Sequence, residues 1–160
     1  MYLAILPIFT FVAGIVALTI YNTKQNKRKQ EILISTFGNS FLFNKKFVRA
    51  AVFTSGRKNT SLIFNACHIY TTDDALLIFG YKDLGIFTIE IVPLILTNNP
   101  QKYYYLSGSA TIIKPKKFNL NSFNSDVYIE YGESGWQTTN VEIRLIKLTP
   151  EEKQHLLFLK

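Results

Sequence analysis

The chain has 160 residues, carries 18 Lys and Arg against 11 Asp and Glu, and is 48% hydrophobic. This length allows one ordinary domain, or one domain with an appendage. A single cysteine excludes a disulfide-built scaffold and any metal site that needs several cysteines. The 13 Phe, 9 Tyr and 1 Trp, together with only 18% charged residues, exclude a disordered chain.

Residues 1–21 form an uncharged apolar stretch. Seventeen of these 21 residues are hydrophobic, and the exceptions are Pro7, Thr10, Gly14 and Thr19. A helix of about 20 apolar residues spans the ~30 Å hydrocarbon core of a bilayer. A buried core helix usually keeps a polar stripe, and this stretch has none. The pattern therefore predicts a transmembrane helix over residues 1–21.

A cleaved signal peptide is the alternative to an anchor. Such a peptide needs positive charge before a shorter apolar run and a cleavage site of small residues. Here the basic cluster follows the run, at Lys24, Lys27, Arg28 and Lys29. Because positive flanks stay on the cytoplasmic side, we expect a single-pass anchor with its N-terminus outside and the rest of the chain in the cytoplasm.

The positive charge is concentrated beside the apolar stretch. Residues 22–58 hold nine basic residues and one acidic residue, a net charge of +8, whereas residues 59–160 have a net charge of −1. Each Lys or Arg near an anionic leaflet contributes about 1 kcal/mol of attraction. A nucleic-acid-binding protein would carry its basic surface on the folded domain. We therefore expect the lipid bilayer as a partner, and no nucleic acid.

Residues 22–47 are expected to form a basic juxtamembrane linker with good helix formers at its start. Within residues 32–47, Leu33, Phe37 and Phe41 recur at i, i+4 and i+8. This spacing fits an amphipathic segment on the membrane surface, or one that packs onto the following domain. Of the two, we favour packing onto the domain.

Residues 48–160 show the pattern of a β domain, because the apolar period changes to two and turn residues recur at short intervals. We predict about seven strands, including a hairpin that joins ALLIFGYK to GIFTIEIV across Lys82–Gly85. The segment YYYLSGSATIIKP is expected to be extended. A cross-strand ion pair between Glu130 and Arg144 is expected on the last two strands.

A closing helix is predicted over residues 149–160. Thr149 and Glu152 have the spacing of a capping box, and Pro150 occupies the first helical position. Short strands followed by a helix with an apolar face predict an antiparallel barrel or sandwich whose open end the helix plugs.

This order of elements resembles the bacterial pleckstrin-homology-like, or GRAM-like, domains. The segment ACHIYTTDDALLIFGY is similar to their early hairpin, and DVYIEYGESGWQTTNVEIRLIKLTPEEKQHL is similar to their last two strands and closing helix. The whole chain also resembles small membrane-anchored proteins of Bacteroidota, whose composition is rich in Lys, Asn, Ile and Phe. The resemblance implies a PH-like domain in a bacterial inner-membrane protein, but a fold alone does not define a function.

Two groups of residues are candidates for binding. A phosphate or lipid headgroup is expected to contact the loop SGRKNTS and the basic flank, namely Arg57, Lys58, Lys24, Lys27, Arg28 and Lys29. A solvated loop is the alternative for Arg57 and Lys58. Trp136, in the turn GESGWQT, and Tyr104 are candidates for a protein partner, because Trp and Tyr dominate contact sites. A side chain folded back over the barrel end is the alternative for Trp136.

The residues with nucleophilic or metal-binding chemistry are explained by structural roles. Cys67 and His68 are neighbours on a predicted strand, so their side chains point to opposite faces and do not form a nucleophile–base pair. The other histidine, His155, is distant in sequence, and two histidines without nearby carboxylates make a poor metal site. We expect no metal and no cofactor.

The carboxylates also have ordinary explanations, since Asp73 and Asp74 occupy an expected turn. An enzyme would need either this pair, or Glu130 with Glu133, to converge with His68 in a pocket. No catalytic motif is present in the sequence. The expected function is a non-enzymatic binding or scaffolding module for a protein partner at the membrane. The alternative is a domain that binds anionic lipid headgroups.

Overall fold

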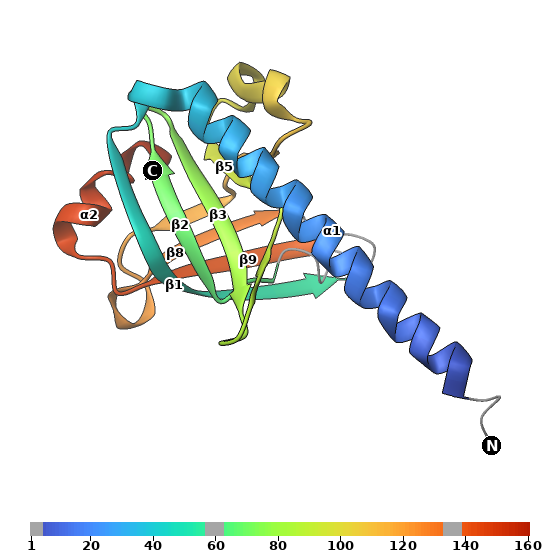
Figure 1. Ribbon diagram of the computed structural model, residues 1–160. Helices are drawn as coiled ribbons and strands as arrows, with labels where there is room; N and C mark the ends of the chain where they lie inside the picture. The colour runs from blue at the N-terminus through green and yellow to red at the C-terminus, as the bar shows by residue number, and fades with distance from the viewer. Residues whose placement is uncertain (1–4, 57–62, 133–138) are drawn as a thin grey trace.

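The computed structural model describes residues 5–56, 63–132 and 139–160, with side chains from Thr10 onward. A long helix, α1 (Ile5–Phe37), lies diagonally across one face of a curved sheet, and its N-terminal half projects beyond the sheet (Figure 1). The described strands are β1 (Phe43–Gly56), β2 (Ala66–Thr71), β3 (Ala75–Asp83), β4 (Thr88–Glu90), β5 (Leu94–Thr97), β6 (Thr111–Ile113), β7 (Lys117–Asn119), β8 (Val127–Gly132) and β9 (Thr139–Ile146). The short helices are η2 (Gly38–Ser40), η3 (Pro100–Leu106), η4 (Phe123–Ser125), α2 (Pro150–Gln154) and η5 (Leu157–Leu159).

The nine described strands form one sheet in the order β6-β5-β3-β2-β1-β9-β8-β7, and β4 pairs separately with β3. The described pairs are antiparallel except β5 with β6. β1 pairs with β2 on one side and with β9 on the other, so the first and last strands are neighbours. Because β6 and β7 stand at opposite ends of this order, the sheet is a half-barrel and not a closed barrel.

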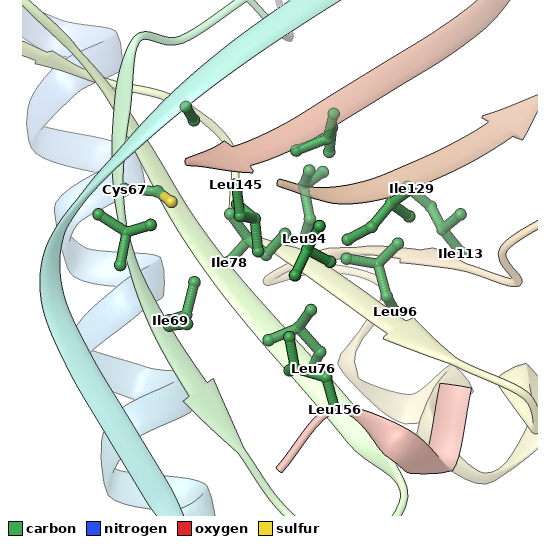
Figure 2. Close-up of a cluster of buried hydrophobic side chains, with 14 of the residues drawn as sticks. Cys67, Ile69, Leu76, Ile78, Leu94, Leu96, Ile113, Ile129, Leu145 and Leu156 are labelled. Carbon is green, nitrogen blue, oxygen red and sulfur yellow. The ribbon is translucent and has the colours of Figure 1, made fainter. Parts of the chain in front are cut away.

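The concave side of the half-barrel holds the larger hydrophobic core. Side chains from β2, β3, β5, β8 and β9 point into it, and Figure 2 shows Ile78, Leu94 and Ile129 among them. The C-terminal segment adds Leu156 and Leu159, which are both buried in this core. The predicted plug by a terminal helix is therefore confirmed.

The terminal helix itself is shorter than predicted. α2 ends at Gln154, and η5 continues the chain with a tighter turn. The predicted capping box is present, since Glu152 N donates to Thr149 Oγ1 at 3.3 Å and Thr149 N donates to Glu152 Oε2 at 2.8 Å. The cap satisfies two backbone donors that begin a helix too short to be stable alone.

A second hydrophobic core lies on the convex side, between the sheet and α1. Leu33 and Phe37 are buried there against Leu77 and Phe79 of β3, and Tyr103 of η3 joins them. Residues 22–37 are thus helical, and the expectation that the segment after residue 32 packs onto the domain is confirmed. The alternative, an amphipathic segment free to lie on a membrane surface, is wrong for Leu33 and Phe37.

Two expectations of secondary structure met different outcomes. The hairpin across Lys82–Gly85 is confirmed, because β3 and β4 pair from Asp83 with Thr88 to Tyr81 with Glu90. The expected extended conformation of Tyr103–Leu106 is wrong, since these residues belong to η3, which starts at Pro100. A proline at the first helical position favours a helical turn, and here it overrides the β propensity of the tyrosines.

Gly80 is a close-packing point of β3 that tests the inner core. A Cβ atom at this position would lie 2.7 Å from Phe64 Cγ and 2.8 Å from Ile91 Cδ1. We predict that Gly80→Ala lowers the free energy of unfolding by about 1–3 kcal/mol, because both neighbours must shift within a packed core. Chemical denaturation of the full chain in mild detergent measures the change. Gly108→Ala is the matched control, because nothing lies within 4 Å of its new Cβ, and equal losses for the two variants would contradict this packing.

Candidate functional site

The middle of α1 is fixed to the sheet by polar side chains. Asn26 Nδ2 donates to the backbone oxygen of Glu90 at 2.9 Å, and Gln30 Nε2 donates to Glu90 Oε2 at 2.8 Å. Gln30 is buried, so its amide would lack a partner without this carboxylate. The positions 26, 30, 33 and 37 recur every three or four residues, which puts them on the one helix face that meets the sheet. The helix therefore docks through a polar contact at β4 and an apolar contact at β3.

Two hollows follow the seam between α1 and the β3–β4 hairpin. The first, of about 600 Å³, is apolar and lies between Ile15–Lys24 of the helix and Phe87–Ile89 of the hairpin. The second, of about 570 Å³, lies between Asn22–Lys29 and the strand residues near Glu90. Ile89 lines both hollows, so together they form one seam that changes from apolar to polar along the helix.

The four basic residues predicted on the flank take different places around α1. Lys24 lines the apolar hollow, and Lys29 lines the polar hollow together with Lys82 of β3. Lys27 and Arg28 are exposed on the helix surface. The structure therefore brings two of the predicted residues to the seam, and adds Lys82, which sequence reasoning missed.

The tip of the β3–β4 hairpin carries exposed apolar side chains. Leu84, Ile86 and Phe87 are exposed, and Ile86 reaches 95%. The turn places Gly85 at a φ of +80°, and Leu84 N donates to Phe87 O at 3.2 Å. Tight hairpin turns favour Asn, Asp and Gly, so an isoleucine beside this glycine is the sequence signal that would have marked the tip.

The remaining predicted binding residues do not join this site. Arg57, Lys58 and Trp136 lie outside the described residues, as does Glu133. Tyr104 is 72% exposed on η3, beside the equally open Tyr105, whereas Tyr103 is buried. Tyr104 thus stays a candidate contact residue, although it lies on a helical turn and not on a strand.

Cys67 and His68 lie on opposite faces of β2, as predicted. Cys67 is fully buried in the inner core, and burial raises the pKa of its thiol to about 12. His68 accepts a hydrogen bond from Phe47 N at 3.1 Å through Nδ1, and partial burial lowers the pKa of its imidazole. Phe47 has a φ of +59° at the bulge of β1, so this hydrogen bond holds an uncommon backbone conformation.

The two described carboxylates predicted as possible catalytic groups are engaged elsewhere. Asp74 accepts from Tyr103 Oη at 2.5 Å and from Lys102 Nζ at 2.8 Å, and these bonds hold the pKa of its carboxyl below the usual value against the effect of partial burial. Neither partner is His68. This contact ties the β2–β3 turn to η3.

Glu130 has a similar structural role on β8. It is buried, and it accepts from Tyr128 Oη at 2.9 Å and from Lys117 Nζ at 3.1 Å, which lowers the pKa of its carboxyl. The expected pair of Glu130 with Arg144 is wrong, because the register sets Glu130 opposite Glu142. Lys117 of the neighbouring strand supplies the positive charge.

Metal and membrane criteria were applied to the same residues. Across 5–56, 63–132 and 139–160, no group of three or more His, Cys, Asp or Glu side chains could hold a metal ion. Within the described part of the chain, no helix combines the length and the apolar character needed to cross a membrane. The span predicted for residues 1–21 starts outside that part.

Comparison with known proteins gives no family assignment. No family model, no curated protein and no solved structure matches this chain.

Proposed function

We propose that this protein is a membrane-anchored, non-enzymatic binding or scaffolding module. Residues 1–21 insert into the bilayer, and the half-barrel presents its surface to a protein partner beside the membrane. The PH-like assignment remains a proposal of the same kind. It is supported by the half-barrel, whose core a C-terminal helical segment closes.

One observation carries this proposal: the apolar side chains in the first half of α1 are uncovered. Phe11, Val12, Ile15, Val16, Leu18, Ile20 and Tyr21 are all exposed, and Phe11 reaches 70%. They occur on several sides of the helix, so one flat protein contact would not cover them. Exposed apolar surface of this extent marks a membrane or protein contact. The basic cluster that begins at Lys24 follows at once, as expected at the boundary with anionic headgroups.

The docking of α1 supports a module that is held close to the bilayer. The helix runs without interruption from the apolar stretch to Phe37, and its later turns pack on β3. The half-barrel is therefore connected to the anchor by a helix fixed at Asn26, Gln30, Leu33 and Phe37, and not by a flexible tether.

We predict that the double variant Val12→Asp, Val16→Asp moves the full chain from the membrane fraction to the soluble fraction. Both valines are exposed, so the change removes no packing within the protein. An acidic side chain at the centre of a span costs about 2.5–3.5 kcal/mol for each residue. Quantitative fractionation of cells that express each form measures the shift.

The matched control is Ile32→Asp, Thr36→Asp, which has the same spacing on exposed positions of α1 beyond the basic cluster. It should stay with the membranes. A high-salt wash separates the alternative function, because a peripheral headgroup binder is released by salt and an anchored chain is not. Release of the unchanged protein by salt would contradict the anchor.

The proposed orientation is a single pass through a bacterial inner membrane with the N-terminus outside. Its support is the basic cluster on the C-terminal side of the apolar stretch, which favours a cytoplasmic location for the half-barrel. A reporter that is active only outside the cytoplasm, fused after Lys160, is expected to stay inactive. Activity of this fusion, with the protein still in the membrane fraction, would reverse the orientation.

A further inference from the structure

We infer that the tip of the β3–β4 hairpin is a second membrane-contacting element, which inserts Leu84, Ile86 and Phe87 into the bilayer beside α1. This inference rests on the proposed anchoring and adds a role for the folded half-barrel. The occupant of the exposed tip is then the interfacial region of the same bilayer that receives the helix.

The chemistry of the tip is the first argument. The two central residues of a tight hairpin are the most solvent-exposed part of a sheet, and Ile86 is 95% exposed there. Leaving three large apolar side chains in water is unfavourable by about 25 cal/mol for each Å² that could be buried. A bilayer interface covers such a tip without requiring a complementary protein surface.

The position of the tip is the second argument. Phe87 lines the apolar hollow opposite Ile15 and Ile20, so the hairpin lies beside the last part of the apolar helical segment. From Ile15 to the end of that segment at Tyr21 is about 9 Å at ~1.5 Å per residue. Interfacial elements bury their apolar side chains about 5–10 Å into the headgroup and acyl boundary. The two depths agree.

The charges around the tip are the third argument. Lys24 lines the same hollow as Phe87, and Lys82 precedes the turn on β3, so positive charge borders the apolar tip on the side away from the N-terminus. Lysines at this level suit anionic headgroups, and their aliphatic stems tolerate the boundary. Asp83, the acidic residue next to the turn, has its carboxylate engaged by Gly85 N at 2.9 Å.

The tip is also held in a defined shape, which a penetrating element requires. Asn65 clamps the base of the turn, since its Nδ2 donates to Asp83 O at 3.0 Å and its Oδ1 accepts from Asp83 N at 2.8 Å. These bonds satisfy backbone groups that a bilayer would not. The side chains at the tip therefore enter as a preformed wedge.

The test uses an environment-sensitive fluorophore on Ile86→Cys in the full chain, reconstituted in vesicles of phosphatidylethanolamine and phosphatidylglycerol that carry a quencher on the acyl chain. Cys67 is buried with a raised thiol pKa, so the introduced cysteine takes the label. Ile86 is exposed, so the substitution leaves the core intact, and Leu84→Cys gives an independent reading. Phe123→Cys, on the exposed η4, is the matched control away from the seam.

We expect several-fold stronger quenching at Ile86 and Leu84 than at Phe123, and quenching at Ile86 comparable to that of a label at Leu18→Cys on the helix. Quenching at Leu18 without quenching at Ile86 would overturn this inference and leave the anchor in place. Absence of quenching at both positions would overturn the proposed function as well. A blue-shifted label at Ile86 that lipid-borne quenchers do not reach would show that protein, such as a second copy of the chain, covers the tip, and would also overturn the inference.

Discussion

The burial of β3 on both faces is the constraint on which the rest of this structure depends. Residues from Ala75 to Tyr81 are all buried, which is unusual for a strand in an antiparallel sheet. Leu76 and Ile78 enter the inner core, while Leu77 and Phe79 enter the outer core beneath α1. Without α1, the outward side chains of this strand would face water. The long helix is therefore part of the fold as well as a carrier of the apolar N-terminal stretch.

The composition of α1 changes along its length in a way that reflects these two tasks. Its described first half is apolar and exposed, its middle is polar and basic, and its last turns bury Leu33 and Phe37. The polar contact with Glu90 lies between the two apolar parts. Hydrogen bonds are directional, so this contact adds a defined rotation and register to the non-directional apolar packing. The seam and the hairpin tip owe their position beside the helix to this docking.

Local patterns in the sequence predicted the elements whose signals are local. The capping box at Thr149, the hairpin at Lys82–Gly85 and the apolar recurrence at Leu33 and Phe37 all depend on residues within a few positions of each other, and all are confirmed. The helical turn at Tyr103 was missed, because β propensity was read without the preceding Pro100.

Features set by long-range register could not be read in the same way. The pairing of Glu130 with Glu142 depends on how β8 aligns with β9, and a shift of two residues changes which charges face each other. The site at the seam is of this kind too, since it joins Lys24 and Lys29 to Lys82 and Phe87, more than fifty positions away. Sequence gave half of the site, the basic flank, and the fold supplied the hairpin.

The central claim is that α1 and the half-barrel form one rigid unit. The most direct test is the distance distribution between spin labels at Tyr21→Cys, on the helix, and Phe123→Cys, on the far loop, measured by pulsed electron resonance in the full chain. Both side chains are exposed, so labelling disturbs no packing. A single narrow distribution that is the same in detergent and in vesicles is the result that the account predicts. A broad distribution would show that the helix moves independently of the sheet, and would contradict it.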